Sequence, residues 1–340
     1  MSADLTTAGT RERVLDAIRA NDRFLLVTHE NPDGDALGSL VAMHGVLRQL
    51  GKDALMFINA DEFPMPYEYR FFDLGPAVSL VPDDLPARVV VFLDCGNIDR
   101  APEELRDGDL RILNVDHHHD NTRFGTIDHV VPEASCTAEI VWDLMRSLGV
   151  DASLEIAEAL YVGLVTDTGR FMYENTGTRA HVMAAELIDA GVDVHEIYRR
   201  LYEGVPYGKL RLLAHALNAV RRFDGGRLTL SRLTREMFAD AQAEDSYSEG
   251  IVDHLRGVEG TKVAALVREL NGNASPRAKV SLRAADPAVD VSAIARAGGG
   301  GGHRQAAGFT TQLDDEHLVA FLRDSLAAQL AALPDDHSSR

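Results

Sequence analysis

The stretch Phe24-Leu25-Leu26-Val27-Thr28-His29-Glu30-Asn31-Pro32-Asp33-Gly34-Asp35-Ala36 decides the fold of the first half of this chain. Its first four residues form an apolar run, which predicts a short buried strand. Pro32 and Gly34 then interrupt any regular element. The amphipathic segment over 36–50 predicts a helix that Gly51 terminates. The stretch is therefore expected to form a strand, a tight loop and a helix.

Three side chains of this loop, His29, Asp33 and Asp35, have the character of metal ligands. The loop follows the strand, so they lie at the carboxyl edge, where open α/β sheets bind ligands. Two carboxylates this close repel each other, which raises the pKa of one of them or requires a cation. An Asx turn with an N-cap Asp and an exposed His would explain the same residues. The loop alone leaves both interpretations open.

Two further apolar runs end in the same kind of residue. The run over 88–93 predicts a central parallel strand, and Asp94 follows it directly. The run over 110–115 predicts another buried strand, and Asp116-His117-His118-His119 follows it. A surface histidine run can be harmless, but this one comes directly after a buried strand. We therefore interpret both strand ends as parts of a functional site.

Most of the remaining first half has helical periodicity. The segment over 154–165 is apolar almost all round, which predicts a core helix, and it runs into Asp167. An Asp at the end of so apolar a segment needs a partner, because burying a charge is costly. Further helices are expected over 11–20, 135–148, 178–189 and 194–202, and a further strand over 54–59.

The second half of the chain changes character. A helix is expected over 207–222, and strands follow from Leu228, over 262–270 and over 278–284. We therefore predict an α/β protein in which an N-terminal parallel-sheet domain is joined by a helical linker to a smaller mixed α/β C-terminal domain. The expected boundaries are a first domain over 1–205, a helical linker over 206–223 and a second domain over 224–340.

The outstanding feature of the second domain is the glycine run over 298–302, which His303 follows. Five consecutive glycines leave main-chain N–H groups open to close approach by an anion. We expect His303 and Ala306–Ala307 to open a helix whose N-terminus favours negative charge. A flexible linker is the alternative, although no Ser accompanies the glycines.

Composition limits the class of protein. The 340 residues carry a formal net charge of −19, which argues against the basic track that long nucleic acid requires. No apolar run is long enough to span a membrane, and the first ten residues lack the apolar core of a signal peptide. Cys95 and Cys136 lie in apolar contexts, so we expect them to be buried thiols of a cytoplasmic protein.

The strand ends and loops together supply a carboxylate-rich set with histidines and no thiolate. The set consists of His29, Asp33, Asp35, Asp94, His117, His118 and Asp167. Such ligands suit Mn²⁺ or Mg²⁺ better than a structural zinc site, and they are too many for one metal with an open position. Two metals about 3.5–4 Å apart, bridged by a carboxylate, are the usual arrangement for hydrolysing phosphoesters.

At these residues the chain resembles a known family. The stretch over 29–36, Asp94, Asp116-His117-His118 and Thr166-Asp167-Thr168-Gly169 resemble the four motifs of the DHH phosphoesterase superfamily. The run over 298–308 resembles the glycine-rich motif of the DHH-associated C-terminal domain. The resemblance covers nearly the whole chain. It is closest to the NrnA group of oligoribonucleases and 3′-phosphoadenosine-5′-phosphate phosphatases, some relatives of which cleave cyclic di-AMP or its linear product pApA.

The resemblance implies a role for each residue of the set. The implied ligands of two Mn²⁺ ions, with Mg²⁺ as the alternative, are His29, Asp33, Asp35, Asp94, His117 and Asp167. His29 and Asp33 would hold one ion, the others would hold the second, and Asp94 would bridge the two. His118 would face the scissile phosphate, and Asp116 would orient a ligand histidine.

The resemblance also implies how substrate is bound and cleaved. The residues that would hold the uncleaved part of the nucleotide are Arg283, Gly300, Gly301, Gly302 and His303. A water molecule between two cations loses a proton near neutral pH, so it can attack phosphorus without a covalent enzyme intermediate. The implied partners are short oligonucleotides or small phosphorylated nucleotides rather than long duplex nucleic acid or a membrane, and the family suggests a homodimer.

Three alternative functions stay open at this point. A manganese inorganic pyrophosphatase shares the Asp-His-His core, but its second domain would not be expected to carry the 298–303 run. A single-strand-specific exonuclease of the same superfamily is usually longer and has a basic channel. A catalytically inactive nucleotide sensor would not need a complete set of ligands for two metals.

Overall fold

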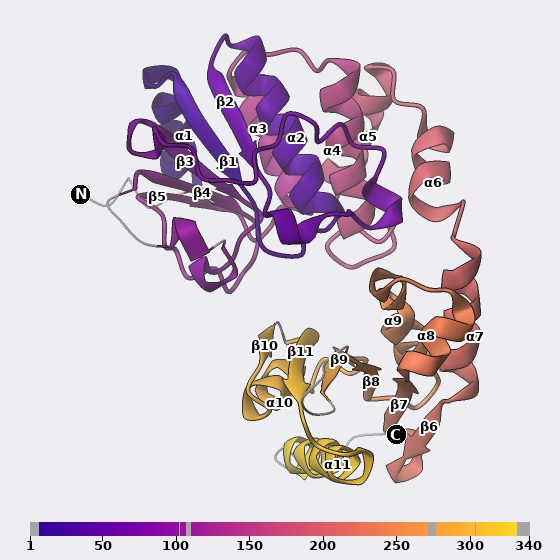
Figure 1. Ribbon diagram of the computed structural model, residues 1–340. Helices are drawn as coiled ribbons and strands as arrows, with labels where there is room; N and C mark the ends of the chain where they lie inside the picture. Colours follow the sequence, from indigo (N-terminus) through magenta and orange to yellow (C-terminus); the bar gives the residue numbers. More distant parts are fainter. Residues whose placement is uncertain (1–6, 102, 107–109, 271–276, 303, 332–340) are drawn as a thin grey trace, which may run out of the picture. The chain divides into compact units, whose positions relative to one another are not determined.

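The computed structural model describes residues 7–101, 103–106, 110–270, 277–302 and 304–331 (Figure 1). The chain divides into two compact units, Met1–Gly204 and Val205–Arg340, which are described separately. No helix in the described ranges combines the length and the apolar character that crossing a membrane requires.

The first unit is built on a parallel sheet of five strands in the order β2-β1-β3-β4-β5 (Figure 1). The strands are β1 (Arg23–Val27), β2 (Asp53–Phe57), β3 (Val89–Leu93), β4 (Ile112–Asp116) and β5 (Ile127–Val130). Every pairing within it is parallel. The predicted parallel sheet is therefore confirmed, and it contains one strand, β5, that the sequence analysis did not find.

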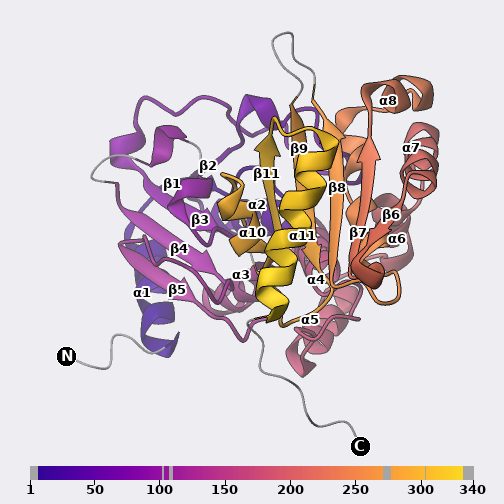
Figure 2. The same cartoon turned by 90° about the horizontal axis from the view of Figure 1, so that it is seen from below.

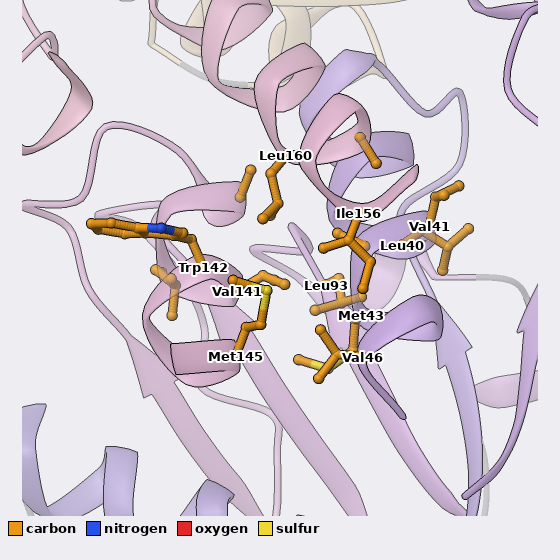
Figure 3. Close-up of a cluster of buried hydrophobic side chains, with 14 of the residues drawn as sticks. Leu40, Val41, Met43, Val46, Leu93, Val141, Trp142, Met145, Ile156 and Leu160 are labelled. Carbon is orange, nitrogen blue, oxygen red and sulfur yellow. The ribbon is translucent and has the colours of Figure 1, made fainter. Parts of the chain in front are cut away.

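Six α-helices accompany this sheet in the described part of the unit. They are α1 (Thr7–Ala20), α2 (Gly34–Gln49), α3 (Thr137–Ser147), α4 (Leu154–Asp167), α5 (Thr178–Asp189) and α6 (Val194–Tyr202). The largest hydrophobic cluster combines residues of these helices with one set of strand side chains, such as Leu93 of β3. Figure 3 shows part of that cluster, where Leu40 and Met43 of α2 lie among Ile156 and Leu160 of α4.

The other face of the sheet has a smaller core. Leu25, Val27, Val90 and Phe92 alternate in sequence with the residues of the first cluster, and they are fully buried. Ile98, Ala101 and Leu105 contribute further apolar side chains to this second cluster. Because both faces of the sheet are covered, its strands appear in the sequence as continuous apolar runs rather than as alternating patterns. Both cysteines are buried free thiols, as expected.

The second unit contains a mixed sheet of six strands in the order β10-β11-β9-β8-β7-β6, of which Figure 2 labels the five from β11 to β6. Its strands are β6 (Arg221–Phe223), β7 (Leu228–Leu233), β8 (Val263–Glu269), β9 (Ala278–Ala284), β10 (Gly301–Gly302) and β11 (Ala306–Thr311). Strands β7 and β8 run parallel, whereas the other pairs are antiparallel. The prediction of a mixed α/β second domain is confirmed.

Helices cover both faces of the mixed sheet. They are α7 (Tyr207–Asn218), α8 (Arg235–Ala241), α9 (Ile251–Arg256), α10 (Val291–Ala297) and α11 (Asp315–Ala331). Residues of α10 and α11 share one hydrophobic cluster with the strands. Residues of α7, α8 and α9 share another, with Ala264 and Leu266 of β8.

Two sequence predictions for the second half were wrong. The helix expected over 207–222 ends at Asn218, because Arg221–Phe223 pairs with β7 as an edge strand. The stretch expected to be a helical linker, 206–223, thus consists of α7 and β6 within the second compact unit. The helix expected at Ala306–Ala307 is instead strand β11, whose Ala307 and Phe309 are buried while Thr310 is exposed. That alternation is the pattern of a half-buried strand, and pairing with β9 stabilises it.

Helices α2 and α4 approach each other very closely, and a glycine makes this possible. A Cβ atom added to Gly38 would lie 2.4 Å from the carbonyl oxygen of Ala159 and 2.9 Å from the amide nitrogen of Gly163. Those atoms belong to the backbone of α4, so they cannot rotate away. The contact matters for function, because α2 begins and α4 ends at candidate metal ligands, Asp35 and Asp167.

Gly38→Ala should therefore lower the free energy of unfolding by about 1–3 kcal/mol, the usual cost of overpacking, despite the better helix propensity of Ala. Gly45→Ala, on the same helix, is the matched control. Its added Cβ would meet the Ile156 side chain at 2.6 Å rather than backbone, so a smaller loss is expected. Chemical denaturation of both variants measures the difference. A Gly38→Ala variant as stable as the wild type would contradict this account of the helix contact.

Candidate metal centre

Three groups of His and Asp side chains gather where β1, β3 and β4 end and where α4 ends. Within each group, the candidate ligand atoms lie within 4.8 Å of one another. The groups are His29–Asp33–Asp94, Asp35–His117–Asp167 and Asp94–His117–His118. Asp94 and His117 each belong to two groups, so the three groups form one continuous centre. All six metal ligands expected from the sequence lie in it.

Asp94 occupies the middle of this centre. It follows β3 in a left-handed conformation, with a φ of 60°, which Asp adopts more readily than most residues. Its Oδ2 lies 3.7 Å from His29 Nε2, and its Oδ1 lies 3.6 Å from His117 Nε2. Thr137 Oγ1 also donates a hydrogen bond to Oδ1 at 3.0 Å. The two oxygens of Asp94 thus face different histidines, as those of a carboxylate bridging two cations would.

Asp35 is held by the N-terminus of α3. It lies in the first turn of α2 and is 1% exposed. Its Oδ2 accepts the Thr137 N–H at 2.6 Å, and its Oδ1 accepts the Ala138 N–H at 2.9 Å. Asp35 therefore caps α3 from another part of the chain, where the helix dipole favours a negative charge. His117 Nε2 lies 3.7 Å from Asp167 Oδ2 and 4.0 Å from Asp35 Oδ2. These distances define the group Asp35–His117–Asp167.

The loop between β1 and α2 caps a helix and also forms part of the centre. Asp33 Oδ1 accepts the N–H groups of Asp35 and Ala36, so Asp33 is the N-cap of α2. The alternative explanation given for this loop, an Asp that caps a helix, is therefore confirmed for Asp33. However, the same side chain also contributes an oxygen to the group with His29 and Asp94. His29 Nδ1 lies 2.9 Å from the Glu30 carbonyl, which leaves Nε2 directed at Asp94.

His118 is oriented by a chain of hydrogen bonds. Its Nδ1 lies 2.7 Å from Asp116 Oδ1, and Asp116 is fully buried. Asn121 Nδ2 donates to the other oxygen of Asp116 at 2.6 Å. Asn114 Nδ2 in turn donates to Asn121 Oδ1 at 3.0 Å. This arrangement fixes the ring of His118 and leaves its Nε2 on the side away from Asp116.

Burial and neighbouring charges shift the pKa values of several side chains of the centre. Burial, together with the nearby charges of Asp94 and Asp167, raises the pKa of Asp35 well above its usual value. Burial and neighbouring carboxylates also raise the pKa of Asp167 to about 7. Burial would raise the pKa of Asp94 too, but the surrounding histidines outweigh it and lower that pKa. For His118, burial lowers the pKa, but the bond to Asp116 prevails and raises it to about 9.

The donor chemistry of this centre fits divalent cations. Oxygen and imidazole ligands without thiolates suit Mn²⁺ or Mg²⁺. The buried carboxylates of Asp35 and Asp94 and the half-buried carboxylate of Asp167 lie close enough to repel one another, and bound cations would relieve that repulsion. The side chains present therefore match the metals expected from the sequence.

The substrate residues expected from the sequence lie in the second unit. Arg283 is on β9, directly opposite Ala306 of β11, and its Nε lies 3.6 Å from Asp253 Oδ1. A Cβ at Gly300 would lie 2.1 Å from the Gly308 carbonyl oxygen, so Gly300 is needed for tight packing on β11. Gly302 is likewise crowded by β11 and has a φ of 132°, whereas Gly301 is exposed and unobstructed. His303 lies outside the described residues.

Several residues around the centre were not found from the sequence, among them Arg100, Asn121 and Asn175. Arg100 Nη2 lies 3.0 Å from His29 Nδ1. Asn175 Nδ2 lies 3.2 Å from Asp167 Oδ2, and Asn121 supports Asp116 as described above. An isolated Arg or Asn in a loop carries no spacing signal, so only the tertiary structure reveals these contacts.

Comparison with known proteins identifies the relationship. Residues 23–164 match the N-terminal domain of the DHH family, and residues 228–331 match the DHHA1 domain. The chain belongs to the DHH family. Membership of this family makes it a phosphoesterase hydrolase, the class of enzyme predicted from the sequence.

Several DHH-family relatives are similar over most of their length. The bifunctional oligoribonuclease and PAP phosphatase NrnA of Thermus thermophilus is 35% identical, covering 88% of this chain and 89% of its own. The protein of the same name from Bacillus subtilis is 24% identical, covering 96% and 99%. An exopolyphosphatase-related protein from Bacteroides fragilis has a similar crystal structure, with a TM-score of 0.84, 26% identity and coverage of 96% and 98%.

Asp94→Asn should weaken Mn²⁺ binding to both sides of the centre, because Asp94 contributes to two of the three groups. Asn retains the tolerance for the left-handed backbone and the acceptor for Thr137, so the fold should persist. Isothermal titration with Mn²⁺ measures the loss. Asp189→Asn, at an exposed position at the end of α5, is the control. Wild-type affinity in Asp94→Asn would contradict the bridging role.

Proposed function

We propose that this DHH-family enzyme hydrolyses short oligonucleotides and small phosphorylated nucleotides such as 3′-phosphoadenosine-5′-phosphate, using two Mn²⁺ ions. The observation that carries the proposal is the position of Asp94. Its two carboxylate oxygens face His29 on one side and His117 on the other. One residue can therefore join two cation positions, which is the arrangement that phosphoester hydrolysis uses. The printed names of the NrnA relatives support the choice of substrates.

During hydrolysis, the protein side chains would bind the cations, orient the phosphate and stabilise the charge that develops on its oxygens. A pair of bound divalent cations supplies the Lewis acidity and the activated water for attack on phosphorus. His118 is oriented by Asp116 so that its Nε2 can donate a hydrogen bond to a phosphate oxygen. A donor already held in place stabilises the charge that develops on that oxygen, since little reorganisation is needed during the reaction.

In this proposal, the second unit binds the part of the nucleotide that is not cleaved. The planar guanidinium of Arg283 can donate two hydrogen bonds at once to a phosphate. Its present neighbour is Asp253, at 3.6 Å, so a phosphate would replace a loose and partly exposed ion pair. Gly299 and Gly301 are both exposed and have open space where a side chain would lie, so they are the glycines of this run most open to close approach by a ligand.

Purified enzyme should hydrolyse a diribonucleotide, 3′-phosphoadenosine-5′-phosphate or pApA in the presence of Mn²⁺, and should lose activity after chelation. Steady-state kinetics on these three substrates, with pyrophosphate and long single-stranded DNA alongside, rank the candidate functions. Full activity after removal of all divalent metal would disprove the two-metal proposal. Preference for pyrophosphate or for long single strands would favour the alternative functions.

Arg283→Ala should lower kcat/KM for a diribonucleotide by about tenfold to a hundredfold, because a charged hydrogen bond to phosphate contributes about 1.5–3 kcal/mol. The same variant should bind Mn²⁺ normally and cleave bis(p-nitrophenyl) phosphate at nearly the wild-type rate. Arg323→Ala, which removes an exposed arginine paired with Asp224, is the matched control. Equal losses on both substrates would instead indicate a damaged fold or metal centre.

A further inference from the structure

The five residues Ala134–Ala138, at the start of α3, contact three of the six candidate metal ligands: Asp35, Asp94 and His117. The sequence analysis assigned no role to this segment. The Ala134 carbonyl lies 3.4 Å from His117 Nδ1. The Ser135 carbonyl accepts a hydrogen bond at 2.8 Å from Asn175, the residue that also lies against Asp167. The start of α3 therefore touches ligands that come from several different parts of the chain.

Thr137 makes the most direct of these contacts, and it makes two. Its hydroxyl donates to Asp94 Oδ1 at 3.0 Å, and its backbone N–H donates to Asp35 Oδ2 at 2.6 Å. A carboxylate oxygen has two lone pairs, so each bond leaves the same oxygen able to bind a cation. The buried residue Thr137 thus holds two carboxylates in place. One is Asp94, which belongs to two of the groups, and the other is Asp35, which belongs to the group with His117 and Asp167.

The segment around Thr137 is itself braced from outside the centre. Glu139, which is 4% exposed, accepts the Ser135 N–H at 3.0 Å. Arg179 of α5 donates to the other oxygen of Glu139 at 2.8 Å. These contacts oppose displacement of the start of α3, so Thr137 has a fixed position from which to orient its two carboxylates.

We propose that Thr137 is a positioning residue of the metal centre, whose hydroxyl sets the orientation of Asp94 and whose amide sets that of Asp35. The inference rests on the proposed two-metal function. Residues that support metal ligands in this way typically change metal affinity by tenfold to a hundredfold when they are replaced. The hydroxyl can be removed while the amide is kept, so its contribution is separable.

Thr137→Val removes the hydroxyl but keeps the size of the side chain and the backbone bond to Asp35. Mn²⁺ titration without substrate should show binding weakened by about tenfold to a hundredfold, and the electron paramagnetic resonance spectrum of the loaded protein should change. Thr137→Ser, which restores the hydroxyl, should recover affinity close to the wild type. Thr229→Val is the matched control, because Thr229 is also buried and hydrogen-bonded but lies in the second unit.

The outcomes separate this inference from the proposed function. Wild-type protein that binds no Mn²⁺ would overturn the proposed function itself. Wild-type protein that binds Mn²⁺ while Thr137→Val binds equally well would overturn only the role of Thr137. Equal weakening in Thr137→Ser and Thr137→Val would show that packing rather than the hydroxyl matters. If Thr137→Val does not fold, Thr137→Ser and Thr137→Ala, which differ by the hydroxyl alone, give the same comparison.

Discussion

The crowding of buried carboxylates at one edge of a parallel sheet is the constraint on which the first unit depends. Asp35 and Asp94 are 1% and 2% exposed, and burial together with the charge of Asp94 raises the pKa of Asp35. Such an arrangement is tolerable only where opposite charge or hydrogen-bond donors surround it. Here Thr137 and Ala138 at the start of α3 supply the hydrogen-bond donors. His29 and His117 supply the nearby imidazole groups. Bound cations would supply the remaining compensation.

The packing of the helices serves the same arrangement. A Cβ at Gly163 would lie 2.8 Å from Asp35 Oδ1, so the absence of a side chain on α4 leaves room for that carboxylate. Gly38 allows the backbones of α2 and α4 to approach, and these two helices carry Asp35 and Asp167. Small residues at this crossing thus allow the acidic groups of Asp35 and Asp167 to lie close together despite their repulsion. A pair of carboxylates held this close favours the binding of a cation.

The two units carry different kinds of candidate functional residue. The first unit gathers oxygen and imidazole ligands around the buried carboxylates of Asp35 and Asp94, and burial strengthens the electrostatic interactions of those two groups. The second unit offers Arg283 and the β10–β11 hairpin, whose Gly300 and Gly302 are required by the close packing of two strands. Under the proposed function, this division would separate the general cleavage of phosphoesters from the choice among nucleotides.

The sequence by itself determined the class of fold and the candidate ligands, because apolar runs that end in Asp or His mark the carboxyl ends of parallel strands. The family followed from the resemblance of its motifs to those of the DHH superfamily. The sequence could not determine the state of Ala306–Thr311, since a short stretch after glycines becomes a strand only when β9 pairs with it. The contacts of Thr137, Asn121 and Asn175 with the centre likewise depended on tertiary structure. Hydrogen bonds between residues distant in sequence leave no periodic pattern, so the supporting contacts of the centre appear only once the chain has folded.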